Sequence, residues 1–407
     1  MPSLRRRGFL AACAAGVAAG CLGSPPEFAP ASADGWPMHR RDPGGTNHTD
    51  SPGPRTDPGV AWRSETSAMF DVPAPLVHGD TLYLGTFDRF SAFDATSGER
   101  RWQLSENGQW LDGALVAAPA YGDVMPVVAT RNGYAAIAPS GGVDVPGRQR
   151  AFEARWKRTT VETDQIDRLL GFSQRAVPPV AADGRVYVVA SAGEAAVTAV
   201  DAGTGATAWT TPVPRATDAR VAVADGRVFV PTFGDGLHAL DAASGERRWT
   251  APTDGPHVYP PTATSEGVYT HDREFVYAFD PASGDELWRV DGEDAAGLSD
   301  TRTPLAADGE HVYAVGSTDD GTAVVALDAD TGAHRWARAV GTEEVPPVVA
   351  DGTLYVPDDD GVVALDAATG ERRWVRGDGR VASLSVVDTT AYATTMDGLL
   401  YALEGSA

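Results

Sequence analysis

The stretch Asp94-Ala95-Thr96-Ser97-Gly98-Glu99-Arg100-Arg101-Trp102 carries the pattern that decides the fold: an Asp, a Gly four residues later, and a Trp four residues after the Gly. The pattern occurs six times along the chain. Its members are Asp94, Gly98 and Trp102; Asp201, Gly205 and Trp209; Asp241, Gly245 and Trp249; Asp280, Gly284 and Trp288; Asp328, Gly332 and Trp336; and Asp366, Gly370 and Trp374. Trp209, Trp249 and Trp288 are spaced by 40 and 39 residues. A period near 40 residues is typical of β-propeller blades.

The sequence between two such tryptophans predicts the rest of a blade. In the last repeat, short apolar runs at 347–350, 353–356 and 362–365 are separated by turns that contain Asp and Gly, and Arg373-Trp374 begins a fourth run. Asp-Gly between short β-branched runs is a strong hairpin signal. Each repeat is therefore expected to form four antiparallel strands.

The count of closing tryptophans predicts how the ring closes. Eight are found, at positions 62, 102, 156, 209, 249, 288, 336 and 374, but Trp62 has no blade before it. The C-terminal repeat, in turn, has three strand-like runs and no tryptophan. If the strand around 60–63 joins that repeat as its fourth strand, the ring closes and two exposed sheet edges disappear. The prediction is an all-β, eight-bladed propeller whose second blade is degenerate at Ala136-Ile137-Ala138 and has a Gly-rich insertion at 141–150.

The repeated residues are expected to be structural rather than catalytic. The Asp has the spacing of an Asx turn, in which its carboxylate accepts backbone N–H groups. The Gly allows a positive φ angle, and the Trp buries a large apolar surface while its indole N–H seeks a partner on the neighbouring blade. A catalytic residue has no reason to recur six times.

The overall charge is strongly acidic. The chain has 56 Asp and Glu against 33 Lys and Arg, a formal charge of −23, and Lys157 is its one lysine. Such a composition suits a halophilic protein, because concentrated salt screens the self-repulsion. Ordinary acidity from a GC-rich genome is the alternative. Either origin disfavours nucleic acid as a partner, since phosphate backbones are bound by clustered Lys and Arg.

Residues 1–21 are predicted to be a targeting segment. Arg6 and Arg7 begin a stretch that resembles the twin-arginine export motif, and the apolar run after it is too short to span a bilayer. Residues 18–21 resemble a lipobox, which predicts lipidation of Cys21 at the outer face of the cell membrane; a plain cleaved signal is the alternative. Residues 22–35 then form a flexible tether, and 36–407 the propeller. Both cysteines, Cys13 and Cys21, precede the propeller, so no disulfide is expected within it.

The Asp…Gly…Trp pattern resembles the tryptophan-docking repeat of the pyrroloquinoline quinone (PQQ)-type β-propellers, over about residues 36–405. This superfamily includes the quinoprotein alcohol dehydrogenases and BamB-like lipoproteins. Residues 36–42, Trp-Pro-Met-His-Arg-Arg-Asp, also resemble the opening of the BamB-like members. The resemblance is specific for the fold and much less so for the function.

For the dehydrogenase members, the resemblance implies PQQ in the channel, a Ca²⁺ ion and a vicinal disulfide beside the quinone. The chain has no cysteine pair, and no calcium-binding set can be matched residue by residue. No catalytic, cofactor-binding or metal-binding residue is therefore assigned.

Other candidate sites have ordinary explanations beside the functional ones. Acidic residues recur on the turns between second and third strands and could gather Ca²⁺, although Asp before Gly is normal turn chemistry: Asp235, Asp272, Asp319, Asp320, Asp358, Asp359, Asp360 and Asp397. The histidines lack the spacing of a zinc site, and His257 and Tyr259 are expected near the channel mouth. Long connections at 103–113, 157–176 and 290–303 could form a partner surface, with Trp110, Lys157, Arg158, Arg168 and Arg175 as candidates.

The sequence thus predicts an exported, lipid-anchored, monomeric propeller that binds another protein or a surface ligand without catalysis. Two alternatives stay open: a PQQ-dependent oxidoreductase, and a small-ligand sensor with an aromatic-lined channel.

Overall fold

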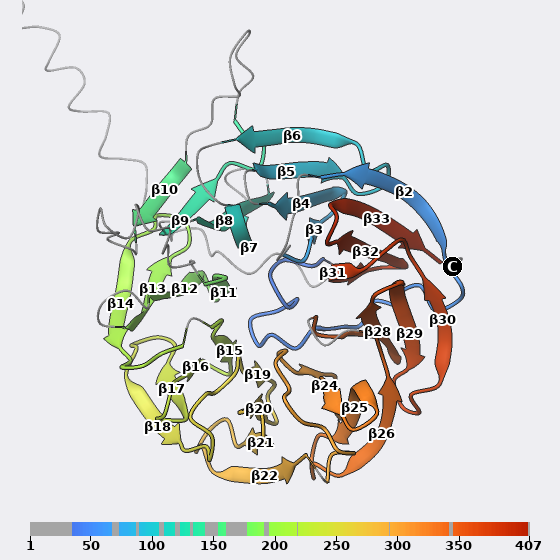
Figure 1. Cartoon of the computed structure of the whole chain (residues 1–407). Helices are drawn as coiled ribbons and strands as arrows, with labels where there is room; N and C mark the ends of the chain where they lie inside the picture. Colours follow the sequence, from blue (N-terminus) through green and yellow to red (C-terminus); the bar gives the residue numbers. More distant parts are fainter. Residues whose placement is uncertain are drawn as a thin grey trace, which may run out of the picture.

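The computed structural model shows eight four-stranded blades arranged in a ring (Figure 1). It describes residues 35–66, 73–86, 89–118 except 106–109, 123–130, 133–142, 154–159, 177–190, 195–217, 219–292, 294–341 and 345–405. All regular elements in these ranges are strands. The predicted eight-bladed, all-β propeller is confirmed.

The blades are numbered I to VIII in chain order. Blade I contains β3 (Leu76–His78), β4 (Thr81–Gly85), β5 (Arg89–Asp94) and β6 (Arg100–Ser105). Blade II contains β7 (Trp110–Ala118), β8 (Asp123–Thr130), β9 (Gly133–Ile137) and β10 (Ala154–Thr159). Blade III contains β11 (Val180–Ala182), β12 (Arg185–Ala190), β13 (Ala196–Asp201) and β14 (Thr207–Pro212). Blade IV contains β15 (Ala222–Ala224), β16 (Arg227–Pro231), β17 (Leu237–Asp241) and β18 (Arg247–Ala251).

Blade V contains β19 (Thr262–Ala263), β20 (Val268–His271), β21 (Phe275–Phe279) and β22 (Glu286–Asp291). Blade VI contains β23 (Ala306–Ala307), β24 (His311–Thr318), β25 (Gly321–Asp328) and β26 (His334–Ala339). Blade VII contains β27 (Val348–Ala350), β28 (Thr353–Asp358), β29 (Gly361–Asp366) and β30 (Arg372–Arg376). Blade VIII contains β31 (Val381–Val387), β32 (Thr390–Thr395), β33 (Leu399–Glu404) and, from the other end of the chain, β2 (Gly59–Glu65).

Each blade runs antiparallel from an innermost first strand to an outermost fourth strand (Figure 1). The turns that join first to second and third to fourth strands therefore lie on one side of the ring, here called the turn face. The turns that join second to third strands, and the connections between blades, lie on the other side, here called the loop face.

Strand β2 closes the ring. It pairs antiparallel with β33, from Gly59 opposite Glu404 to Glu65 opposite Leu399. The C-terminal blade thereby gains the fourth strand that its own sequence lacks, and the predicted closure through the strand of Trp62 is confirmed.

Burial explains why the strands differ in sequence. Second and third strands are covered on both faces by neighbouring blades, as in β12 and β13, where all but the end residues are buried. They consequently read as nearly continuous Val, Ala, Leu and Tyr runs. Fourth strands form the rim, and in β2 and β10 the tryptophan is the one buried residue.

Candidate functional site

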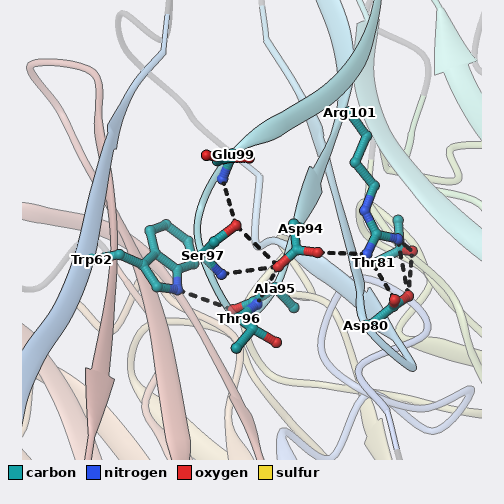
Figure 2. Close-up of polar contacts among 9 residues, drawn as sticks. All are labelled: Trp62, Asp80, Thr81, Asp94, Ala95, Thr96, Ser97, Glu99 and Arg101. Atoms are coloured by element: carbon teal, nitrogen blue, oxygen red, sulfur yellow. Dashed lines mark hydrogen bonds and ion pairs between the residues drawn. The ribbon is translucent and has the colours of Figure 1, made fainter.

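The repeated Asp organises the turn between third and fourth strands (Figure 2). Asp94 Oδ1 accepts hydrogen bonds from the backbone N–H groups of Thr96 at 3.0 Å and Ser97 at 2.9 Å. The amide of Gly98 donates to the Asp94 carbonyl at 2.8 Å. The same bond to the amide three residues on is made by the other five: Asp201, Asp241, Asp280, Asp328 and Asp366.

In four of these turns, an arginine that was not predicted to take part bonds to the motif Asp. Arg101 donates to Asp94 Oδ2 at 2.7 Å and reaches across to Asp80, in the turn between first and second strands, also at 2.7 Å (Figure 2). Arg101 lowers the pKa of Asp94, and it lowers the pKa of Asp80 to about 2. Arg248, Arg335 and Arg373 pair in the same way with Asp241, Asp328 and Asp366. The signal was present, because each of these arginines directly precedes the motif tryptophan.

The repeated Trp of one blade contacts the turn of the next. Trp62 Nε1 donates to the carbonyl of Ala95 at 3.0 Å, and Trp209 Nε1 to that of Ala242 at 3.0 Å. The acceptor is the residue that follows the motif Asp. Four more tryptophans donate to this position in the following blade: Trp156 to Ala202, Trp249 to Pro281, Trp288 to Ala329 and Trp336 to Ala367.

The repeated Gly faces that same indole. A Cβ atom on Gly98 would lie 2.3 Å from the Trp62 ring, and the φ angle of Gly98 is +71°. Gly205, Gly245, Gly284, Gly332 and Gly370 likewise have positive φ and face the tryptophan of the preceding blade. A side chain is therefore excluded at this position for two reasons: the positive φ angle disfavours it, and the indole ring occupies the space that it would need.

The degenerate second blade keeps its docking glycine. Trp102 donates to Pro139 O at 3.1 Å, and Gly141, with a φ of +64°, faces the Trp102 ring. Gly141 thus takes the place of the motif Gly, although it was predicted to begin the Gly-rich insertion at 141–150. Trp374 differs again, since it donates to Pro54 O at 2.9 Å.

Residues 35–53, here called the plug segment, occupy the centre of the ring. In Figure 1 this blue chain runs among the innermost strands before it reaches β2. Its backbone bonds to innermost strands of six blades: I through Trp36, II through Pro37, IV through Pro43, V through Gly44, VI through Thr46 and VII through Asn47. Beyond these, β1 (His48–Thr49) pairs in parallel with β27, and Gly53 N donates to Asp388 O of blade VIII.

Two buried arginines fix the plug segment. Arg40 is 2% exposed and donates to the carbonyls of Pro261 at 3.0 Å and Leu305 at 2.6 Å. Arg220 is 3% exposed and donates to the carbonyl of Asp42 at 2.5 Å. Burial lowers the pKa of both guanidinium groups, that of Arg220 to about 10. Asp42 lies close enough to oppose this shift through its negative charge.

A row of rings leads from the loop face toward the interior. Phe233 is 50% exposed in the turn between β16 and β17, and its ring centroid lies 6.1 Å from that of His257. His257 contacts Tyr259 at 4.7 Å, and Tyr259 stacks on the fully buried His271 at 4.3 Å. Arg273 Nε donates to the Tyr259 hydroxyl at 2.9 Å. His257 and Tyr259 were predicted to lie near the channel mouth, but no sequence pattern marked Phe233 or His271 as their partners.

The acidic residues on the loop face hold turns in place. Asp272 accepts from Gly255 N at 2.6 Å and from the Tyr277 hydroxyl at 2.5 Å, and Asp358 accepts from Gly341 N at 2.8 Å. Asp359 pairs with Arg380 at 3.1 Å. Within the described residues no three His, Cys, Asp or Glu side chains come together in a way that could hold a metal ion.

The predicted long loops are only partly loops. Much of the connection expected at 103–113 belongs to β6 and β7, and Trp110 lies in β7. Lys157 and Arg158, expected in the connection at 157–176, lie in β10. The strand ladder extends further here than the polar sequence suggested. Arg168, Arg175, Arg6, Arg7 and Cys21 lie outside the described residues. Among the described residues, no helix has the length and apolarity needed to cross a membrane.

Comparison with known proteins agrees with this architecture. The chain is 20% identical to BamB from Moraxella catarrhalis, with a TM-score of 0.59 over 85% of this chain and 99% of that one. It is 14% identical to quinohemoprotein alcohol dehydrogenase from Comamonas testosteroni, with a TM-score of 0.69 over 92% and 81% of the two chains. At these identities the likeness concerns the fold alone.

Among curated proteins, a serine/threonine-protein kinase, AfsK from Streptomyces griseus, is 29% identical over 287 residues, which is 62% of this chain. The chain spans only about a third (34%) of the length of that relative. The sequence model of the family described as "Outer membrane protein assembly factor BamB" matches residues 55–197, 193–317 and 272–407. Because these matches together cover most of the propeller, the chain belongs to the BamB family.

Proposed function

We propose that the protein is a non-catalytic scaffold that is exported, anchored by a lipid on Cys21, and binds another protein through its loop face. The observation that carries the proposal is the plug segment, which occupies the centre of the ring with the chain's own residues. With its interior occupied in this way, the propeller offers its outer surfaces for binding.

The residues at the centre do not fit the quinone that the resemblance to dehydrogenases implies. At the level of the innermost strands, the space is taken by Trp36, Met38 and Arg40, all buried, and by Arg220. Both guanidinium groups already donate to protein carbonyls. A planar cofactor at this level would have to displace a segment bonded to six innermost strands, so we propose that no quinone binds here.

The loop face offers a feature suited to protein binding. Phe233 and Leu287 are the large apolar side chains exposed to 50% among the described residues. Phe233 contacts His257, which in turn contacts Tyr259, whereas Leu287 lies at an exposed position of the rim strand β22. Aromatic side chains supported by a packed layer are typical of the energetic centre of an interface. Phe233 is therefore the residue we assign to partner contact.

Site-specific crosslinking tests this assignment. A photoreactive phenylalanine analogue at position 233 is compared with the same analogue at position 287, which matches it in exposure. Irradiation of intact cells should yield a discrete crosslinked protein from position 233 and none from position 287. Identical products at both positions, or none at either, would contradict a binding role for this surface.

The export and anchoring steps need separate variants. Cys21→Ser should release the protein from the membrane fraction, and Arg6→Lys with Arg7→Lys should leave it inside the cell. Two lipid chains on Cys21 would hold it stably, since one acyl chain gives only marginal binding. A Cys21→Ser protein that stays with the membrane would rule out the lipid anchor.

The quinoprotein alternative predicts a different result. After addition of PQQ and Ca²⁺, such a protein should reduce a dye in the presence of simple alcohols or sugars. The scaffold proposal predicts no dye reduction and no change of intrinsic tryptophan fluorescence on addition of PQQ. The sensor alternative would need an open, aromatic-lined channel, whereas the described residues fill the centre with the buried side chains of Trp36, Met38, Arg40 and Arg220.

A further inference from the structure

We infer that the chain enters the propeller from the turn face, so that an anchor at Cys21 holds the turn face toward the membrane and presents the loop face, with Phe233, to partners. The part of the inference that concerns the membrane rests on the proposed lipid anchor. The part that concerns the direction of the chain rests on contacts within the plug segment alone.

The first contact sets the direction in which the chain enters. Trp36 and Val77 exchange two backbone hydrogen bonds of 2.9 Å in an antiparallel bridge. Strand β3 runs from the loop face toward the turn at Gly79 and Asp80, so the chain at Trp36 runs the opposite way. Gly35 lies beside the Val77 carbonyl and the Cα of His78, the last residue before that turn. The chain therefore enters the plug segment at Gly35 from the turn face.

The end of the plug segment returns to the same face. Strand β1 is parallel to β27, which leads to the turn at Asp351 and Gly352. Gly53 N then donates at 2.7 Å to Asp388 O, in the turn between β31 and β32. Both ends of the segment thus lie at the turn face, and the segment dips into the ring between them.

Burial makes this direction a fixed property of the fold. Trp36 and Met38 are 0% exposed, and Arg40 is held by carbonyls of two blades. Gly35, the first described residue, consequently lies at a packed position near the ring axis. A chain that departed from a rim strand could bend toward either face.

Chain length sets the expected distances. The thirteen residues 22–34 can span at most about 45 Å when fully extended. A strand of six residues is about 20 Å long. A probe on the turn face should therefore lie closer to the anchor than a probe on the loop face of the same blade, by at most about 20 Å.

Strand β29 provides a matched pair of positions for the test. Asp360 lies just before it on the loop face, Ala368 lies just after it on the turn face, and both are exposed. The sequence contains no cysteine besides Cys13 and Cys21, so each substitution adds one thiol to the propeller.

The first experiment does not depend on the membrane. In the full chain with Cys13→Ser, kept unlipidated, spin labels on Cys21 and on either Asp360→Cys or Ala368→Cys report the distance from Cys21 to each face. The distribution should be centred at a shorter distance for Ala368→Cys. Equal distances, or a shorter one for Asp360→Cys, would overturn the inferred direction.

The second experiment uses the lipidated protein in vesicles that carry an acceptor dye on their headgroups. Energy transfer from a donor should be more efficient from Ala368→Cys than from Asp360→Cys, and the reverse would overturn the orientation. If the protein does not float with the vesicles at all, the anchor and with it the proposed function fails, while the spin-label distances still decide the direction of the chain.

Discussion

The indole nitrogen of Trp62 donates a 3.0 Å hydrogen bond to the carbonyl oxygen of Ala95, which joins the strand that closes the ring to the first blade (Figure 2). Trp62 belongs to β2 and Ala95 to the turn after β5. The same strand therefore completes blade VIII and docks blade I. One joint thus serves for both closure and blade docking, and it uses the same bond that joins five other pairs of neighbouring blades.

Trp62→Phe should therefore cost as much stability as the same change at a joint elsewhere in the ring. Trp156 is the matched control, because it is similarly buried and donates to the carbonyl of Ala202 at 2.9 Å. Each variant loses one buried donor and leaves a carbonyl unpaired, so each should lower the free energy of unfolding by about 1–3 kcal/mol. Urea titration measures both. A negligible effect at Trp62 alone would show that closure does not depend on this bond.

Gly98→Ala should destabilise the protein far more than Gly352→Ala. The two glycines have φ angles of +71° and +72°, so the backbone penalty of about 1–2 kcal/mol is common to both. A Cβ on Gly98 meets the Trp62 ring at 2.3 Å, whereas a Cβ on Gly352 meets nothing within 4 Å. The excess loss at Gly98, measured by the same titration, reports the indole contact. Equal losses would mean that the turn moves away from Trp62 at little cost.

The blades could be predicted from the sequence because their signals are local. The runs expected at 353–356 and 362–365 became β28 and β29, which extend further toward the turn between them because the hairpin pairing continues there. The Asp turn needs four consecutive residues, and the Gly requirement is local as well. The period then repeats these signals often enough to fix the number of blades.

The plug segment could not be predicted from the sequence because its contacts join distant residues. Ala307 N bonds to Thr46 O and Arg40 to Leu305 O, and no periodic pattern marks either pair. Trp36 and Met38 contributed to the family resemblance, but nothing in the sequence indicated where in the fold they lie. Phe233 was missed for a similar reason, since a single aromatic residue in a turn has no pattern until His257 lies beside it.

Arg40→Met should lower the free energy of unfolding by about 3 kcal/mol or more. The substitution preserves the length of the side chain but removes its donors. The buried carbonyl of Pro261 then lacks the bond from Arg40, and that of Leu305 keeps only the bond from the Thr262 hydroxyl. Arg40→Lys should rescue little, because an ammonium group cannot reproduce the planar fork. The exposed Arg372→Met serves as the control and should change stability by less than about 0.5 kcal/mol. Unfolding of Arg40→Met at the wild-type urea midpoint would contradict the anchoring role of Arg40.

His271 should make stability fall between pH 6.5 and pH 4. Burial lowers its pKa from 6.5 to about 4, although its ring donates to the Thr303 carbonyl at 2.8 Å. Between these values the unfolded state binds a proton that the folded state does not, so stability rises with pH. The contribution of the neutral His271 ring to the free energy of unfolding is about 3 kcal/mol. It is complete above pH 6.5 and is lost by about pH 4.

The matched variant for this effect is His271→Gln, which keeps a hydrogen-bond donor and does not titrate. Its free energy of unfolding should lie below that of the wild type at pH 7, and the difference should narrow by about 3 kcal/mol as the pH falls to 4. Calorimetry at several pH values measures the two curves. Parallel curves would show that His271 takes up its proton in the folded state at an ordinary pKa.

Salt should raise the stability of the protein mainly between 0.1 and 1 M KCl. The formal charge of −23 destabilises the compact state by self-repulsion, and the Debye length falls from about 10 Å to about 3 Å over this range. Salt also weakens the exposed ion pairs of Arg101 with Asp94 and Arg373 with Asp366, which lowers the stability, but each pair contributes little to it. A variant with Asp319→Asn, Asp320→Asn and Asp360→Asn, all exposed on the loop face, should show a smaller rise in melting temperature over the same range.

Screening is nearly complete by about 1 M, so the melting temperatures of the two proteins should respond alike to salt above about 1 M. If the wild type gains as much above 1 M as below it, exclusion of salt from the surface rather than charge screening governs its stability.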